Sequence, residues 1–156
     1  MAIYEIDKID KNILRELQTN GRISNVELAK RVGLSATPCL NRVKRLESLD
    51  CIQQYTVRIN PKFMNASILV FVEVRLDRTS KDAFNHFKKA VLKVAEIMEC
   101  HLVSGDFDYL LKARVPDMSA YRNFLGDTLL SLPHINSTRT YIVMEEVKDT
   151  SVNPML

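Results

Sequence analysis

Hydrophobic residues in the first 20 positions recur at the spacing of an amphipathic helix. The apolar residues of this run lie three or four positions apart: Ile9, Ile13, Leu14 and Leu17. Asp7 stands where a helix cap is expected, and Asn20-Gly21 is typical of a helix end. The pattern predicts a first helix between these two signals.

A second short helix is predicted between Ser24 and Gly33. Ser24 can cap it, and Glu27, three residues later, completes the sequence signature of a capping box. Its buried side would be formed by Val26, Leu28, Ala29 and Val32. Gly33 is the kind of residue that ends a helix.

Only Gly33-Leu34 precede a third predicted helix, which Ser35 can cap and which extends to about Leu49. Two helices joined by so short a turn cross steeply, as in the helix-turn-helix unit, whose second helix can enter the DNA major groove. One side of the third helix is apolar: Leu40, Val43 and Leu46. The remaining sides are mainly polar: Thr37, Asn41, Arg42, Lys44 and Arg45.

The rest of the chain alternates between strand and helix patterns. Residues 51–59 are rich in β-forming side chains and predict a short strand, after which Asn60-Pro61 marks a break. We therefore expect a DNA-binding domain over 1–60, a hinge over 61–66 and a second domain over 67–156. Further elements are predicted at 68–76 (strand), after Ser80 (helix), at 97–103 and 109–115 (strands), at 118–130 (helix) and at 135–147 (strand).

This order is βαββαβ, so the fold class is α+β: a helix-turn-helix domain followed by a ferredoxin-like domain. Both helices would cover one face of the sheet. The other face would carry apolar residues mixed with charges of both signs: Phe71, Glu73, Arg75, His101, Val103, Leu110, Lys112, Arg114, Tyr141 and Val143. Such a face favours a second copy of the sheet, and hence a homodimer, which also suits the reading of two-fold operators.

The net positive charge lies in the first part of the 156 residues. Residues 1–60 hold ten Lys/Arg and seven Asp/Glu, whereas residues 61–156 hold twelve of each. Six basic residues against one acid give a net charge of +5 between Arg22 and Leu46. This excess on a helix-turn-helix unit indicates double-stranded DNA as the partner.

Chemistry suggests a division of labour within the predicted interface. Arg42 and Arg45 can donate to guanine edges or to phosphates, Asn41 suits adenine, and Lys44 and Arg22 suit phosphates. The residues alone leave open which role each arginine has. The full set of candidates is Arg22, Asn25, Ser35, Thr37, Pro38, Asn41, Arg42, Lys44 and Arg45.

Three stretches resemble the Lrp/AsnC, or feast/famine, family of bacterial transcription regulators: 20–28, 31–40 and above all 99–111. The resemblance extends from Asp7 to Lys148. It implies dimerisation through the sheet, assembly into octamers or larger species, and an amino-acid effector bound where dimers meet, without any cofactor. The implied effector is leucine, with methionine and other amino acids left open.

The resemblance also implies an effector site around the loop after the second strand of the sheet. Its candidate residues are Leu102, Val103, Ser104, Gly105, Asp106, Asp108, Met118, Tyr141, Ile142 and Val143. The exposed backbone of Gly105, the two carboxylates and an apolar slot of Leu102, Met118 and Ile142 would suit an amino acid. The residues alone favour a simpler interpretation, in which Gly105 makes a hairpin turn and the aspartates cap backbone N–H groups.

Two other functions fit the sequence less well. Cys100 beside His101 has the elements of a nucleophile and base, but neighbours in a strand point to opposite faces, so we expect no enzyme. An amino-acid sensor without DNA binding is disfavoured by the basic cluster. No apolar run is long enough to span a membrane, Met1 to Asp10 is too acidic for a secretory signal, and three scattered cysteines form no metal motif. We expect a cytoplasmic, nucleoid-associated protein.

Overall fold

The computed structural model describes residues 6–77 and 80–154 and divides into two compact units. One unit extends to Arg58 and also includes the segment from Lys148 onward, and the other is Ile59–Val147. The chain therefore passes between the units twice. The second domain expected from the sequence extends to residue 156, whereas the segment from Lys148 onward groups with the first unit.

Side-chain contacts explain this grouping of the C-terminal segment. The Gln18 side chain donates to the carbonyl of Asn153 at 3.3 Å and accepts from its amide at 2.6 Å. The Arg58 guanidinium donates to the carbonyl of Asp149 at 2.8 Å and to its carboxylate. These four bonds fasten the segment to α1 and to the residues after α3.

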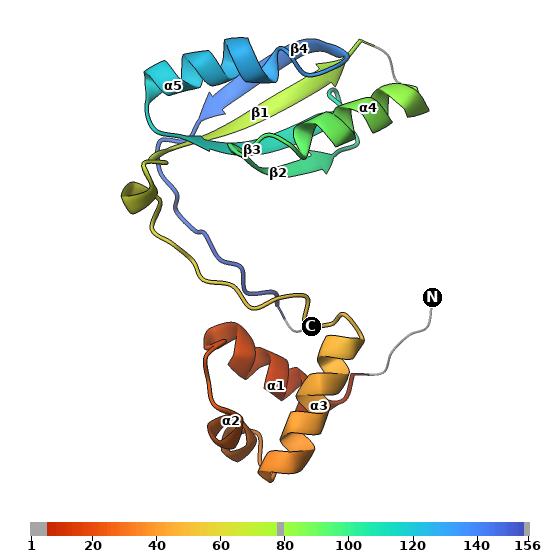
Figure 1. Cartoon of the computed structure of the whole chain (residues 1–156), viewed down its shortest axis with the longest axis vertical. Coiled ribbons are helices and arrows are strands. Elements are labelled where there is room, and N and C mark those ends of the chain that lie inside the picture. The colour runs from red at the N-terminus through yellow and green to blue at the C-terminus, as the bar shows by residue number, and fades with distance from the viewer. Residues whose placement is uncertain (1–5, 78–79, 155–156) are drawn as a thin grey trace. The chain divides into compact units, whose positions relative to one another are not determined.

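The first unit is built from the three predicted helices (Figure 1): α1 (Lys8–Thr19), α2 (Asn25–Arg31) and α3 (Ala36–Ser48). The capping box lies at the start of α1, where Asp7 and Asp10 each accept from the other's amide. Ser24 caps α2, but the Glu27 carboxylate accepts from Arg31 instead of completing a box. Ser35 precedes α3 without forming a side-chain cap bond.

The core of this unit is small and consists of Ile13, Leu28, Ala29, Cys39 and Leu46. Two residues expected inside are outside, since Val26 is 72% exposed and Leu40 is 40% exposed. Cys39, and not Leu40, is the residue of the first turn of α3 that faces the core. Gly33 has a φ of 72°, the left-handed conformation that allows the tight turn between α2 and α3.

Residues 51–59 do not form the predicted strand. This segment has no ladder partner within the described part of the chain, and the side chains of Tyr55, Val57 and Ile59 are exposed. A strand needs a partner for its backbone groups, which β-forming side chains cannot replace. The expected hinge is instead ordered at its start by a short 3₁₀ helix, Pro61–Met64, capped by Asn60.

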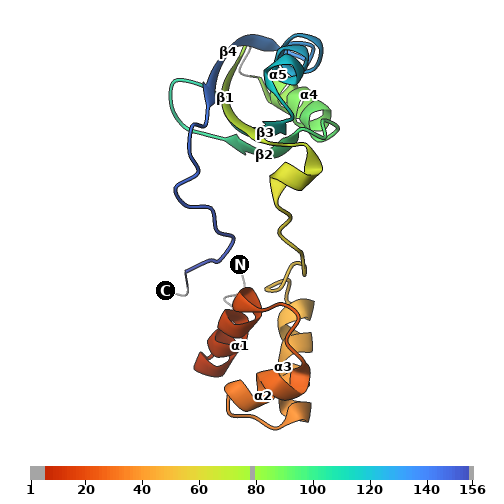
Figure 2. The ribbon, with the colours of Figure 1, turned by 90° about the vertical axis from the view of Figure 1, so that its left-hand side faces the viewer.

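The second unit has the predicted βαββαβ order. Its elements are β1 (Ile68–Leu76), α4 (Lys81–Val91), β2 (Ile97–Leu102), β3 (Tyr109–Val115), α5 (Met118–Asn123) and β4 (Ile135–Ile142). The strands form an antiparallel sheet in the order β2-β3-β1-β4. Both helices cover one face of it, as Figure 2 shows.

The helix predicted over 118–130 is formed without a break, but its hydrogen-bond pattern changes along its length. After Asn123 it becomes a π-helix over Phe124–Leu129, in which the Leu130 amide bonds the Leu125 carbonyl. The wider turn brings both Phe124 and Leu129 into the core. Alternation along β1 is as predicted: Val70, Val72, Val74 and Leu76 are buried beneath the helices, whereas Phe71, Glu73 and Arg75 lie on the open face.

Candidate functional site

A buried carboxylate lies between α1 and the predicted DNA-reading helix α3. Asp10 is fully buried, yet it accepts hydrogen bonds from two arginines of α3. Nη1 of Arg42 donates to Oδ1 of Asp10 at 2.9 Å and to Oδ2 of Asp7 at 2.6 Å. Nη2 of Arg45 donates to Oδ2 of Asp10. Both predicted base readers are therefore anchored within the unit.

The ion pairs change the pKa values of the groups at this anchor. The pKa of Asp7 is lowered, first by the amide of Asp10 that donates to its carboxylate and next by Arg42. The pKa of Arg42 is raised because Asp7 and then Asp10 accept from it. Both shifts favour the charged forms of Asp7 and Arg42.

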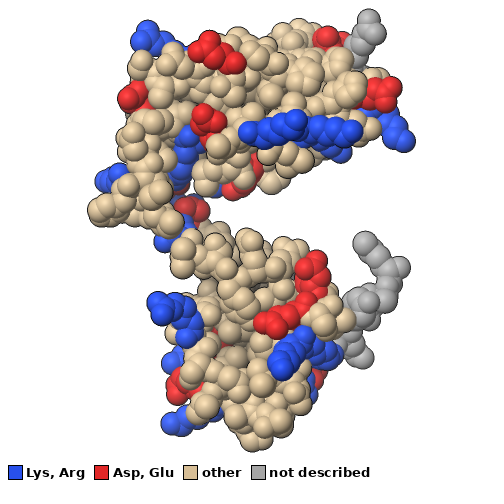
Figure 3. Space-filling view, viewed as in Figure 1, with Lys and Arg blue, Asp and Glu red and all other residues tan. Residues whose placement is uncertain are grey.

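Some cations of the basic cluster in the first unit are paired with acids, and others are not. Arg31 is also paired, with Glu16 at 3.1 Å and Glu27 at 3.0 Å. Within the described residues the other three cations of the basic cluster, Arg22, Lys30 and Lys44, form no ion pair. Acidic and basic side chains accordingly lie side by side on the face shown in Figure 3. The unpaired cations are the ones best suited to phosphates.

The other predicted DNA-binding residues divide into two groups. The Asn25 amide donates to the carbonyl of Ala36 at 2.8 Å, so this side chain joins α2 to the start of α3. The second group consists of exposed residues at the start of α3 and along it: Ser35, Thr37, Pro38, Asn41 and Lys44. Exposed Leu40, which sequence reasoning placed in the core, lies on the same helix.

In the second unit, the loop after β2 is held by hydrogen bonds. Oδ2 of Asp108 accepts from the Leu76 amide at 2.8 Å, and the Asp108 amide donates to Val74 at 3.0 Å. The interpretation of an aspartate as a backbone cap is therefore correct for Asp108. Ser104, Gly105 and the side chain of Asp106 stay exposed, while the Asp106 carbonyl accepts from Arg75.

The predicted effector residues do not meet within one chain. Leu102 ends β2 at one edge of the sheet and is level, through Tyr109 and Val74, with Thr138. Ile142 ends β4 at the other edge, four residues beyond that level. Strand spacings of about 4.8 Å and rises of about 3.3 Å place the two residues roughly 20 Å apart.

The predicted site is consequently split into two groups at diagonally opposite corners of the sheet. The residues from Leu102 to Asp108 form the loop group. Met118, at the start of α5, lies at the same end of the sheet as Tyr141, Ile142 and Val143 (Figure 1), and these four form the second group. The apolar slot of Leu102, Met118 and Ile142 expected from the sequence is not formed inside one chain.

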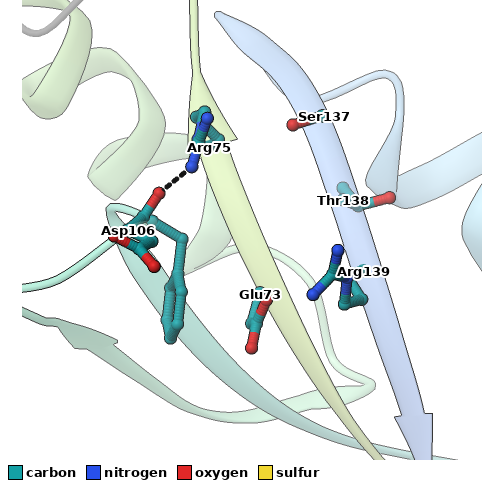
Figure 4. Close-up of a pocket in the computed structure, with 7 residues that line it drawn as sticks. Glu73, Arg75, Asp106, Ser137, Thr138 and Arg139 are labelled. Atoms are coloured by element: carbon teal, nitrogen blue, oxygen red, sulfur yellow. Dashed lines mark hydrogen bonds between the residues drawn. The ribbon is translucent and has the colours of Figure 1, made fainter.

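A pocket of about 480 Å³ lies beside the loop group, at the β1–β4 end of the open face (Figure 4). It is lined by Glu73, Arg75, Asp106, Phe107, Ser137, Thr138 and Arg139. Figure 4 shows Arg75 bonded to Asp106, with Glu73 on the same strand as Arg75 and Arg139 on the neighbouring strand β4. Among the described residues that line the pocket, Phe107 alone is apolar, so the pocket suits charged groups better than an aliphatic side chain.

Elsewhere on the open face the charged residues pair with one another. Glu99 accepts from Lys112 at 2.9 Å, an interaction that lowers the Glu99 pKa. The Tyr141 hydroxyl donates to Glu73 at 2.9 Å, and Arg114 pairs with Glu146 at 2.6 Å. The face is therefore a mixture of apolar residues and charges of both signs, as predicted.

The geometry opposes catalysis by Cys100 and His101. Cys100 packs against the core on the helix side, and burial raises the pKa of its thiol, whereas His101 is exposed on the open face. Within residues 6–77 and 80–154, no three His, Cys, Asp or Glu side chains are arranged to hold a metal ion. No described helix is both long and apolar enough to cross a bilayer.

A helix-turn-helix unit joined to a ferredoxin-like unit is an architecture of DNA-binding transcription regulators. Residues 6–47 match the AsnC-type helix-turn-helix domain, and residues 69–152 match the Lrp/AsnC ligand binding domain. The chain belongs to the Lrp/AsnC family, whose members are transcription regulators and not enzymes. The resemblance found in the sequence is thus confirmed.

Individual relatives support the same assignment. The chain is 65% identical to the leucine-responsive regulatory protein of Escherichia coli K12 over 94% of this chain and 90% of that one. A transcriptional regulator of Neisseria meningitidis in complex with L-Met has a TM-score of 0.91 at 40% identity, covering 96% and 97% of the two chains. A feast or famine regulatory protein of M. tuberculosis complexed with L-methionine has a TM-score of 0.88 at 29% identity, covering 96% and 99%.

Proposed function

We propose that α3 reads operator DNA through its exposed residues together with Arg42 and Arg45, while Arg22, Lys30 and Lys44 contact phosphates. The observation that carries this division is the ion pairing of the first unit: Arg42 and Arg45 are held by Asp10, whereas the other three cations form no ion pair among the described residues. A held guanidinium favours directional contacts with bases, and a mobile cation favours phosphates.

Lys44→Ala is expected to weaken binding to operator and to unrelated DNA by the same factor, several-fold at physiological salt. Loss of one phosphate contact should lower the slope of log affinity against log salt by about 0.9. The measurement is fluorescence anisotropy of labelled duplexes over a salt series. Lys89→Ala, an exposed lysine on α4, is the matched control and should leave both slopes unchanged. An unchanged slope for Lys44→Ala would remove this residue from the interface.

The amino-acid effector that we propose is leucine, with methionine as the second candidate. Support comes from the leucine-responsive relative and from the two similar structures that contain L-Met. We place the site between two copies of the chain, the loop group of one facing the Met118 and Tyr141–Val143 group of the other. A separation of roughly 20 Å within one chain is too large for both groups to contact one amino acid.

Such a site makes effector binding depend on assembly. We propose a homodimer formed through the open sheet face and dimers joined into octamers or larger species, in a cytoplasmic, nucleoid-associated protein. Leucine that binds one assembly state better than another shifts the population between them. The paired α3 helices are then repositioned without contacting the effector.

Complementation between two variants tests the shared site. Leu102→Ala and Ile142→Ala remove exposed apolar side chains from the two groups, and each alone should reduce leucine sensitivity about ten- to a hundredfold. Oligomers assembled from both variants contain some sites with neither change, so they should regain a high-affinity fraction in calorimetry. Without such a fraction in the mixture, a site shared between copies is contradicted.

A further inference from the structure

Asp10 occupies an unusual place for a carboxylate in a DNA-binding unit. It is fully buried, and its two oxygens accept from Arg42 and Arg45 of α3 and from the amide of Asp7 at 3.2 Å. Each arginine uses one nitrogen for these bonds. A guanidinium has five N–H donors, so most donors of both arginines are left for another partner.

The exposure of the two side chains agrees with this count. Arg42 is 30% exposed and Arg45 is 45% exposed, whereas the acid that holds them is inaccessible. The anchored end of each guanidinium therefore faces the core and its remaining edge faces solvent. An oriented edge of this kind matches the geometry of base-edge or phosphate recognition.

We propose that Asp10 is a positioning residue for DNA specificity: it fixes Arg42 and Arg45 of the recognition helix in the orientation that reads the operator. The inference rests on the proposed role of α3. A free arginine must lose rotamer freedom when it binds, but an arginine already held by Asp10 loses less. The directional contacts gain from this preorganisation, and a purely electrostatic attraction does not.

An alternative role for Asp10 is to inhibit DNA binding by competing with phosphates for the arginines. Release of both arginines to DNA would leave a carboxylate buried without a cation, which is a strongly unfavourable state. The pairs are therefore retained on DNA. The same carboxylate also cancels positive charge near the interface, so it reduces attraction to any DNA while it sharpens discrimination.

Asp10 is thus expected to lower the affinity for any DNA and to raise the discrimination between sequences. Both effects can be measured with Asp10→Asn, which keeps the shape of the side chain and removes its charge. The probes are a duplex selected by the wild-type chain from a random pool and a scrambled duplex of the same composition, titrated in a salt series. We expect the affinity ratio of selected to scrambled duplex to fall about tenfold or more. Affinity for the scrambled duplex should stay the same or rise, a result that partial unfolding would not produce.

Glu16→Gln is the matched control, because Glu16 is also an acid of α1 paired with an arginine, but that arginine, Arg31, lies on α2. It removes the same charge and should leave the ratio unchanged. If Asp10→Asn keeps the wild-type ratio, the inference is overturned.

A second variant covers the case in which Asp10→Asn does not fold. Arg45→Lys retains the charge but loses the planar fork, so scrambled binding should persist while the ratio falls; an unchanged ratio overturns the inference. A wild-type chain that enriches no duplex from the random pool would overturn the proposed function as well. That outcome differs from one in which the wild type discriminates and the variants discriminate equally.

Discussion

Replacement of both Arg42 and Arg45 by alanine is expected to lower the free energy of unfolding of the first unit by about 3–5 kcal/mol, because buried Asp10 loses both cations. The carboxylate would keep only the Asp7 amide as a partner. Loss of DNA binding by this variant would consequently report unfolding as well as lost contacts. Urea unfolding followed by circular dichroism measures the change.

The difference in burial between Asp10 and the two arginines provides a control for this prediction. The two arginines are 30% and 45% exposed and can be solvated when Asp10 is removed, whereas Asp10 is fully buried in the intact unit. Asp10→Asn added to the double variant should therefore recover most of the lost stability. A double variant as stable as the wild type would show that the pairs are not needed for folding.

Phe87→Ala is expected to destabilise the second unit by about 3–5 kcal/mol, the usual range for a large aromatic side chain removed from a core. Phe87 of α4 is fully buried, and its ring centroid lies 4.6 Å from that of Tyr109 on β3. The cavity would lie between α4 and the sheet, where little can move to fill it. Amide exchange of β1 and β3 in rising urea reports this unit directly.

Phe63→Ala is the matched control, because it makes the same substitution at a phenylalanine that is 85% exposed. We expect it to change stability by less than about 0.5 kcal/mol. Equal effects of Phe63→Ala and Phe87→Ala would contradict the described core.

The parts of the fold that depend on periodicity could be predicted. Burial of Val70, Val72 and Val74 follows from alternation, and the ends of α1 follow from Asp7 and Asn20, because these signals are local. The strand expected over 51–59 failed because strand formation depends on a partner that composition does not reveal. The same limit applies to the change from α-helix to π-helix after Asn123, which depends on how both Phe124 and Leu129 fit the core.

The candidate sites were predicted less completely, because long side chains can contact another helix and because strand order is not encoded locally. Helical spacing correctly placed Arg42 and Arg45 away from the apolar side, but a long side chain can bend back to an acid of another helix. In the sequence Asp10 is an acid in the first turn of α1, and its burial becomes visible only when α3 packs over it. The split between Leu102 and Ile142 required strand order and register, which no pattern along the chain contains.

The double passage of the chain between its units has a mechanical consequence. One connection enters β1 at Ile68, and the other leaves the neighbouring strand after Ile142, where the Val143 amide still bonds Leu69. A single linker acts as a swivel, but two linkers that start beside each other resist rotation, because turning one unit would wind them together. A twist of the β1–β4 pair therefore displaces the starting points of both connections together.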